Sequence, residues 1–136
     1  MYGDKARTTE NFTDHYSLVE NIGSGGYGTV WTCIDRETKE MRAVKIVSDK
    51  KCFRKTWCPR YRRNVPDEVA LSLSLRHPNL LSLLEVFYDE QSKYWCYVME
   101  YEKDYVDLFD YIDKNGALSS ASSSFITRQV IKVSLF

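Results

Sequence analysis

A glycine-rich segment at residues 23–30 constrains the fold of this chain more than any other feature. It reads Gly-Ser-Gly-Gly-Tyr-Gly-Thr-Val and leads into aromatic and β-branched residues that predict a strand. In a dinucleotide-binding turn the glycines would stand at the start of a helix, whereas the residues on both sides here predict a hairpin. Gly23, Gly25 and Gly28 allow backbone angles closed to other residues and let amides approach phosphate oxygens, so the loop is a candidate cover for nucleotide phosphates.

Two charged residues downstream could act on such a phosphate. Lys45 stands between two β-branched apolar residues in a short strand, where a lysine is costly to bury unless it meets an anion. Glu68 follows Pro66, which suits the first turn of a helix, at the end where acidic side chains are favoured. The leucines and serines after it alternate with the period of a strand, so the helix is expected from its ends and its length. Either residue alone would be an ordinary surface group, but together with the loop they indicate a nucleotide site.

The order and approximate spacing of these features resemble the small lobe of a protein kinase. The series consists of the glycine loop, Ala43-Val44-Lys45, Glu68, His77-Pro78-Asn79 and the segment 98–102. Further resemblance to the PIM family of serine/threonine kinases is carried by residues 23–28, 65–66, 107–112 and 116–118. The resemblance implies an α+β fold: a protein-kinase-like small lobe with a five-stranded antiparallel sheet and one regulatory helix, then a hinge and the first helices of a truncated large lobe.

The resemblance also assigns an ATP site. Lys45 would contact the α- and β-phosphates and Glu68 would hold it, because phosphoryl transfer depends on aligning and neutralising charge. These two are the expected catalytic residues, and the catalytic base is absent from this sequence. The residues implied to bind ATP are Ile22, Gly23, Ser24, Gly25, Gly26, Tyr27, Gly28, Val30, Ala43, Lys45, Met99, Glu100, Glu102 and Asp107.

Adenine needs a flat apolar slot with polar backbone groups on one edge. By resemblance the roof of this slot would be formed by Ile22, Val30 and Ala43. Met99 would be the gatekeeper at its back, although such side chains would equally pack the core of a small sheet. Main-chain groups of Glu100 and Glu102 would meet the base. PIM kinases carry a proline in the hinge where this chain has Glu102, so the backbone donor that proline lacks should be present here.

An acidic stretch at residues 100–114 contains six acidic and two basic side chains, a net charge of −4. By resemblance Asp107 would lie at the ribose end of the slot, and Asp107 and Asp110 would receive arginines of a basic protein substrate. The alternative is a solvated helix start, where carboxylates are stabilised by the helix dipole. The sequence leaves both interpretations open.

A basic stretch at residues 49–63 contains seven basic side chains and one acidic one, a net charge of +6. Phe53, Trp57 and Tyr61 are spaced by four, as on one helical face, but Pro59 interrupts that face. We expect a connection between the lysine strand and the glutamate helix, with aromatic side chains packed on the sheet and charges in water or on an acidic partner. The chain as a whole has a formal charge of zero, so nucleic acid is not an expected partner.

The remaining pattern gives a coarse layout. Strands are expected at 16–22, 29–34, 41–47, 80–87 and 94–100, and helices at 66–76 and 107–114. A further helix would start within 119–124, with Phe125, Ile126, Val130 and Val133 as its buried stripe in a complete large lobe. Without the rest of that lobe, we expect this apolar face to be exposed to water. We divide the chain into a flexible N-terminus at 1–13, a small lobe and hinge at 14–104 and the start of a large lobe at 105–136.

Two motifs that complete a kinase site, His-Arg-Asp and Asp-Phe-Gly, do not occur in the sequence. Magnesium is therefore expected only for a complete kinase, with its ligands outside these residues, and residues 1–136 alone are expected to be inactive. A truncated gene model, a splice product or a partial chain would each explain the ending. Two functions remain open: the ATP-binding part of a serine/threonine kinase acting on basic proteins, or a catalytically inactive product that acts through nucleotide or partner binding.

Cysteine usage and hydropathy limit other roles. Four cysteines and two histidines lack the paired spacing of a metal site, so no metal centre is expected within the chain. No secretory signal is seen, and no apolar run is long enough to cross a membrane. We expect a reduced, cytoplasmic setting, with the nucleus as a second location, and a monomeric complete kinase.

Overall fold

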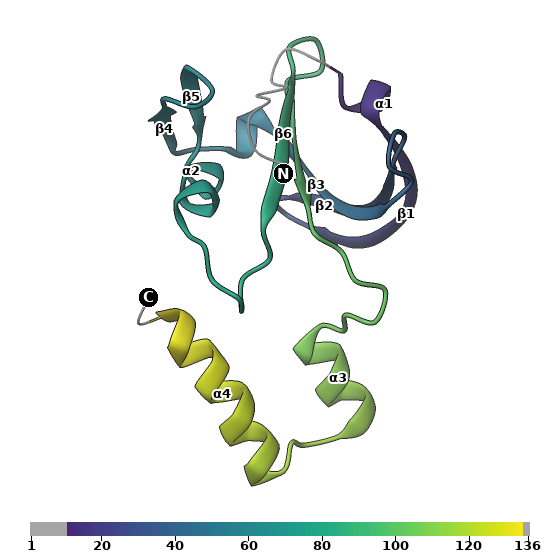
Figure 1. The fold of residues 1–136 in the computed structure, drawn as a ribbon, viewed down its shortest axis with the longest axis vertical. Coiled ribbons are helices and arrows are strands. Elements are labelled where there is room, and N and C mark those ends of the chain that lie inside the picture. Colours follow the sequence, from purple (N-terminus) through teal and green to yellow (C-terminus); the bar gives the residue numbers. More distant parts are fainter. Residues whose placement is uncertain (1–10, 135–136) are drawn as a thin grey trace. The chain divides into compact units, whose positions relative to one another are not determined.

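The computed structural model describes residues 11–134 as two compact units, residues 11–76 with 82–101 and residues 77–81 with 102–134. The first unit contains α1 (Phe12–His15), β1 (Tyr16–Gly25), β2 (Gly28–Asp35), β3 (Met41–Ser48), the 3-10 turn η1 (Asp49–Lys51), β4 (Lys55–Cys58), β5 (Arg63–Pro66), α2 (Asp67–Ser74), β6 (Leu83–Asp89) and β7 (Tyr94–Met99). The second contains α3 (Leu108–Asn115) and α4 (Ser120–Ser134) (Figure 1). None of the helices in this part of the chain combines the length and the apolar character needed to cross a membrane.

Five strands of the first unit form one antiparallel sheet in the order β1-β2-β3-β7-β6. All five strands predicted from the sequence are present, with ends shifted by up to three residues. The predicted α+β fold, a five-stranded antiparallel sheet with a helix packed beside it, is confirmed.

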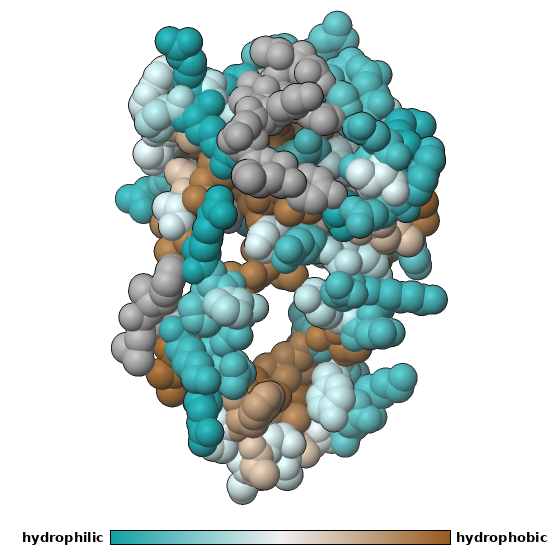
Figure 2. Space-filling model, viewed as in Figure 1, coloured by the Kyte–Doolittle hydropathy of each residue, from teal (hydrophilic) through white to brown (hydrophobic). Residues whose placement is uncertain are grey.

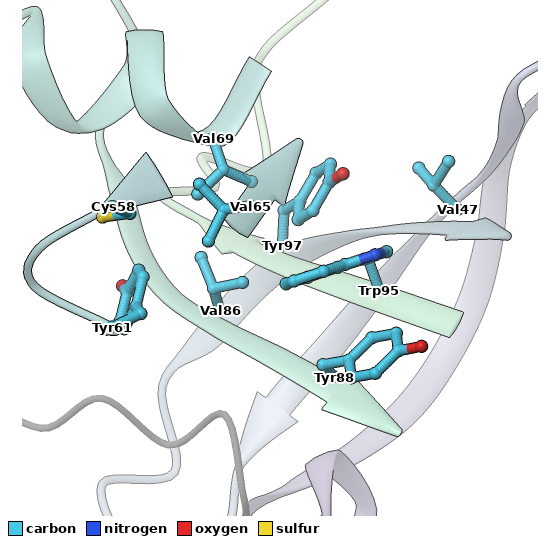
Figure 3. Close-up of a cluster of buried hydrophobic side chains, with 9 residues drawn as sticks. All are labelled: Val47, Cys58, Tyr61, Val65, Val69, Val86, Tyr88, Trp95 and Tyr97. Atoms are coloured by element: carbon cyan, nitrogen blue, oxygen red, sulfur yellow. The ribbon is translucent and has the colours of Figure 1, made fainter. Parts of the chain in front are cut away.

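One face of the sheet forms a core with α2, β4 and β5. Neighbouring residues along a strand point to opposite faces, and Trp95 and Tyr97 of β7 both point to this one. In Figure 3, Val65 of β5 and Val69 of α2 point toward Val86 of β6. We call this cluster the helix-side core; it consists of Val47, Cys58, Tyr61, Val65, Val69, Val86, Tyr88, Trp95 and Tyr97.

The packing of α2 explains why its sequence alternates like a strand. Val69 is buried, and Leu73, one turn later, is half-buried against the helix-side core. Leu71 and Leu75 are 58 % and 41 % exposed. The alternating leucines therefore divide between two faces of one helix. The helix ends at Ser74, two residues before the predicted end, because the next residue takes extended backbone angles.

The opposite face forms a second core that joins the two edges of the sheet. Phe12 and Tyr16 stack with ring centroids 5.3 Å apart, and Phe87 of β6 meets them edge-on at 5.7 and 5.9 Å. The Tyr16 hydroxyl donates a hydrogen bond to Glu85 of β6. Since β1 and β6 are the outermost strands, the sheet must curl to bring them together (Figure 1). We call this cluster the edge-side core; it consists of Phe12, Tyr16, Cys33, Val44, Phe87, Cys96 and Val98.

The basic stretch lies in the connection between β3 and α2, as predicted, and part of it forms a hairpin. It begins as η1 and continues through β4 into β5, which pair as a separate two-stranded antiparallel sheet. Tyr61 enters the helix-side core, but Phe53 and Trp57 are 92 % and 59 % exposed, so the predicted packing is wrong for these two. Phe53 precedes β4, Trp57 lies within it and Tyr61 lies in the turn that follows, so no single helix or strand carries the three aromatic side chains.

Helix α3 of the second unit forms within one residue of its predicted bounds. Its N-cap is Asp107, whose side chain accepts a hydrogen bond from the Phe109 amide at 2.7 Å. Gly116 follows the helix with φ 82°, a left-handed angle that glycine adopts without strain. The Asp107 side chain and the glycine backbone at 116 thus set the two ends of the helix.

Helix α4 starts within the predicted segment, with the Ser119 hydroxyl accepting a hydrogen bond from the Ser122 amide at 3.1 Å. The stripe is not buried where it is described, as expected for this helix without the rest of a large lobe. Phe125 and Val130 are 64 % and 59 % exposed, and Ile126 is half-buried. The reason is that nothing in the described residues of the second unit covers this face. The side chain of Val133 lies outside the described residues.

Candidate functional site

Four site candidates of the first unit lie on the helix-side face of the sheet. Residues directly opposite each other in an antiparallel pair share a face. Val30, Lys45 and Tyr97 form one such row across β2, β3 and β7, and Ala43 lies opposite Met99 in the next. Tyr97 belongs to the helix-side core, so Lys45 stands between that core and the residues next to the glycine loop.

Lys45 and Glu68, the two predicted catalytic residues, form an ion pair. Lys45 Nζ lies 2.6 Å from Glu68 Oε1, with side chains 17 % and 55 % exposed. Helix α2 presents Glu68 at this place because the next residue, Val69, is anchored in the helix-side core. A half-exposed pair contributes little to stability. Its effect is to fix the direction of an ammonium that four rotatable bonds would otherwise leave free.

Tyr27, at the tip of the glycine loop, also contacts Lys45. Its ring centroid lies 4.7 Å from Lys45 Nζ, a cation–π distance. The ring folds back over Gly25, where an added Cβ would lie 3.0 Å from a ring atom. The ammonium therefore lies between a carboxylate and an aromatic face, and an anion entering beside it would meet both.

The glycine loop is the hairpin that the sequence predicted. β1 and β2 pair as far as Gly25 and Gly28, with two residues at the turn. Gly28 has φ 153°, and a Cβ there would lie 2.3 Å from the Ile46 carbonyl oxygen. Of the three glycines that the sequence singled out for their backbone freedom, Gly28 uses it, whereas Gly23 and Gly25 do not have a positive φ. Asn21 holds the start of the loop by accepting a hydrogen bond from the Gly23 amide at 3.1 Å.

Other residues implied to bind ATP in the first unit differ in exposure. Ala43 is buried, Val30 and Met99 are half-buried, and Ile22, Ser24, Gly26 and Glu100 are exposed. The Glu100 amide donates a hydrogen bond to the Ser82 carbonyl at 3.2 Å, which joins the end of β7 to the residue before β6. The structure thus places Val30, Ala43 and Met99 on the sheet face that carries Lys45.

The remaining predicted residues belong to the second unit. The Glu102 carbonyl accepts a hydrogen bond from the Tyr105 amide at 3.1 Å. Asp107 caps α3, and Asp110 is exposed in the first turn of that helix. The carboxylates predicted to meet a substrate therefore also stand where a helix start favours acidic side chains.

Sequence reasoning missed the contact of Lys51 with the loop. Lys51 Nζ donates a hydrogen bond to the Gly26 carbonyl oxygen at 2.6 Å. In the sequence Lys51 is one of seven basic residues in the basic stretch, and nothing distinguishes it from Lys50. Its position just beyond β3 would predict the contact only if the register of β3 with β2 were already known.

Within residues 11–134, no three His, Cys, Asp or Glu side chains gather closely enough to hold a metal ion. Magnesium in kinases is held by carboxylate and amide oxygens together with the nucleotide. No such group of side chains occurs in the described residues. The roles proposed for them below are therefore limited to binding and orienting the nucleotide.

Known proteins resemble this chain in sequence over most of its length. The family profile of the protein kinase domain matches residues 16–134. Calcium-dependent protein kinase 3 of Plasmodium yoelii yoelii is 38 % identical over 126 residues, 92 % of this chain and 22 % of that protein. Serine/threonine-protein kinase STK11 of Homo sapiens is 40 % identical over 86 residues, 63 % of this chain and 19 % of that protein. The chain thus spans about a fifth of the length of these curated relatives.

A solved structure extends the similarity to the fold. The crystal structure of Rad53 in complex with AMP-PNP matches with a TM-score of 0.71 at 27 % identity, covering 89 % of this chain and 30 % of that one. The fold and the profile match, which covers most of the sequence, indicate the same family. The chain belongs to the protein kinase family.

Proposed function

We propose that the first unit is the ATP-binding small lobe of a serine/threonine protein kinase that phosphorylates basic proteins. The observation that carries the proposal is the 2.6 Å ion pair of Lys45 and Glu68 on the sheet face beside the glycine loop. A lysine held by a helix carboxylate aligns and neutralises the α- and β-phosphates in phosphoryl transfer. The serine/threonine kinase relatives, and the AMP-PNP complex of the similar Rad53 structure, support a nucleotide as the ligand.

Each residue has a binding or orienting role in this proposal. Lys45 bonds phosphate oxygens, Glu68 holds its ammonium, and the amides of residues 23–28 cover the phosphates. Main-chain groups of Glu100 and Glu102 meet the polar edge of adenine. The apolar walls of the slot are assigned to Ile22, Val30, Ala43 and Met99. Since neither His-Arg-Asp nor Asp-Phe-Gly occurs in the sequence, the roles proposed for these residues stop at holding and aligning ATP.

The test is the dissociation constant of AMP-PNP, measured by isothermal titration calorimetry for the parent chain and for Lys45→Met. Methionine keeps an unbranched apolar side chain on β3 but removes the charge. Loss of a charge-assisted contact costs about 1.5–3 kcal/mol, so binding should weaken by about tenfold or more.

Lys93→Met is the matched control. Lys93 also forms an ion pair in the first unit, with Glu90 at 3.2 Å in the β6–β7 turn. Its replacement should leave the AMP-PNP affinity unchanged. Equal dissociation constants for the parent and Lys45→Met, or a parent that binds no nucleotide, would contradict the proposal.

The preference for basic substrates is proposed from the acidic stretch. Asp107 and Asp110 are assigned to arginines of the substrate, since carboxylates and guanidinium groups form strong paired hydrogen bonds. Asp107 also caps α3, so an alanine there would disturb the helix as well as the charge. Asp107→Asn separates the two roles, because asparagine caps helices about as well as aspartate and carries no charge.

Binding of an arginine-rich peptide at low ionic strength tests the assignment. Asp107→Asn and Asp110→Asn should each weaken binding by about two- to fivefold, as expected for exposed charge pairs. The far-ultraviolet circular dichroism should stay that of the parent. A double variant that binds the peptide with parental affinity would rule out this substrate role.

Finer assignments rest on the same resemblance. We propose a PIM-like subfamily, a small lobe and hinge at 14–104, the start of a large lobe at 105–136, and a monomeric kinase of the cytoplasm and nucleus. The hinge distinguishes this chain from PIM kinases, because Glu102 keeps a backbone donor that proline lacks. Glu102→Pro should therefore weaken AMP-PNP binding, and unchanged affinity would show that this donor does not meet the nucleotide.

A further inference from the structure

Lys51 stands at the end of a segment that leads from the sheet to the glycine loop. β3 pairs with β2 so that Thr29, near the end of the glycine loop, lies opposite Ile46. β3 ends two residues later at Ser48, and η1 follows at once. η1 therefore begins beside the loop, and its last residue, Lys51, reaches the Gly26 carbonyl oxygen at 2.6 Å.

Asp49 fixes the other end of η1 to the helix-side core. Its Oδ1 accepts a hydrogen bond from Trp95 Nε1 at 2.8 Å and lies 2.6 Å from Lys55 Nζ. The Asp49 amide donates to the Lys93 carbonyl at 2.8 Å, and the Cys52 amide closes the turn onto the Asp49 carbonyl at 3.0 Å. Since Trp95 is 1 % exposed, η1 is tied to a well-packed part of the first unit.

The loop has separate restraints at its start, its end and its tip. Asn21 holds the start through the Gly23 amide, and the close approach of Gly28 to the β3 backbone holds the end. The exposed tip between them is bonded to Lys51. We propose that Lys51 is a positioning residue for nucleotide binding, which holds the tip of the glycine loop in the conformation that covers the phosphates.

The proposed effect of Lys51 is entropic. A glycine-rich tip has wide conformational freedom, and ordering it on binding reduces affinity. A tip already held by Lys51 loses less freedom when phosphates enter, so Lys51 would strengthen nucleotide binding without touching the nucleotide. The inference rests on the proposed function, because covering phosphates has meaning only if the first unit binds a nucleotide.

Amide hydrogen exchange tests the contact between Lys51 and Gly26 in the absence of ligand. The whole chain is exchanged, and mass spectrometry follows the peptides that contain residues 23–30. Loss of one hydrogen bond of about 1 kcal/mol shifts a local opening equilibrium by about fivefold, so Lys51→Met should speed exchange by that factor. Lys51→Arg keeps a charged donor and should restore slow exchange. Lys50→Met, at the exposed neighbour on η1, should exchange like the parent. Parental exchange in Lys51→Met, or an equal increase in Lys50→Met, would overturn the inference.

AMP-PNP affinity tests the functional part. Lys51→Met should raise the dissociation constant by about threefold to fivefold through the lost preorganisation, less than Lys45→Met does, and Lys51→Arg should restore it. A parent that binds no AMP-PNP overturns the proposed function. Intact binding with equal dissociation constants for the parent and Lys51→Met overturns the inference alone.

Discussion

The two units differ in how far they bury their large apolar side chains. In the first unit, Trp95, Tyr16 and Phe87 are each 1 % exposed and belong to cores on opposite faces of the sheet. In the second, Phe109 and Phe125 are 75 % and 64 % exposed, and no residue of α3 is buried. Figure 2 shows apolar surface over α3 and α4 in the lower part of the view. Within the described residues, the first unit encloses its own cores and the second does not.

This difference indicates which unit can hold a defined site. Side chains in close-packed cores keep single conformations. The strand that carries Lys45 is therefore held from both faces of the sheet, and the helix that carries Glu68 is held by the helix-side core. The helices of the second unit instead leave an apolar pocket of about 440 Å³, lined by Tyr111, Leu118, Ala121, Ser122, Phe125 and Ile126. The stability of the chain should therefore depend mainly on the first unit.

The largest expected effect compares two phenylalanines. Phe87→Ala should lower the free energy of unfolding by about 3–5 kcal/mol, because it empties part of the edge-side core. Phe109→Ala, at an exposed position of α3, should change it by less than about 0.5 kcal/mol. Urea denaturation followed by circular dichroism measures both. Equal losses of unfolding free energy in the two variants would contradict the claim that the stability of the chain depends mainly on the first unit.

A smaller effect is expected where the two edges of the sheet meet. Burial, and then the Glu85 carboxylate beside it, raise the pKa of Tyr16, so its hydroxyl stays protonated and donates to Glu85. Tyr16→Phe should cost about 1–2 kcal/mol of unfolding free energy, since it removes this bond from a partly buried acceptor. Tyr111→Phe, at an exposed position of α3, should cost nothing measurable. Similar urea midpoints for the two variants would mean that the Tyr16 bond does not stabilise the curl.

The smallest of these effects depends on pH. Burial opposes ionisation of Asp49, but hydrogen bonds from Lys55 and Trp95 outweigh it and lower the pKa of Asp49 from its usual 3.8. A carboxyl whose pKa falls on folding stabilises the fold above its unfolded pKa and loses this contribution as pH falls through the folded pKa. Asp49→Asn should therefore cost about 1 kcal/mol at pH 7 and progressively less below about pH 4.

The matched control lies in the second unit. Asp110→Asn, in the exposed first turn of α3, should change the unfolding free energy little at pH 7 or at pH 3. Guanidinium chloride titrations at a series of pH values give the difference between each variant and the parent. A deficit for Asp49→Asn that stays constant down to pH 3 would show that its ionised form does not stabilise the fold.

Much of the first unit could be predicted from the sequence because its signals are local. The β-branched runs mark the strands, the glycines mark the hairpin, and Pro66 marks the start of α2. The pairing of Lys45 with Glu68 was expected from the family resemblance, since a sequence separation of 23 positions gives no distance in space. The charge of Lys45 in an apolar strand indicated only that some anion had to lie near it.

The contacts that sequence reasoning missed depend on register and curvature. Tyr16 and Glu85 are 69 residues apart and meet only because the sheet curls, and Lys51 meets Gly26 only because β3 ends beside the loop. The β4–β5 hairpin was missed because the aromatic spacing in the basic stretch has the period of a helix. On α4 the apolar period was read correctly, but a pattern does not say whether another surface covers it.

A double-mutant cycle of AMP-PNP dissociation constants tests most directly whether Lys45 and Glu68 act together in nucleotide binding. If Glu68 acts on the nucleotide by holding Lys45, Glu68→Gln should weaken binding in the parent and have no further effect in Lys45→Met. Glu68 is 55 % exposed, so its replacement should leave the fold intact. We predict that the double variant binds AMP-PNP as weakly as Lys45→Met alone. Additive losses would contradict the claim that the two residues form one phosphate-binding unit.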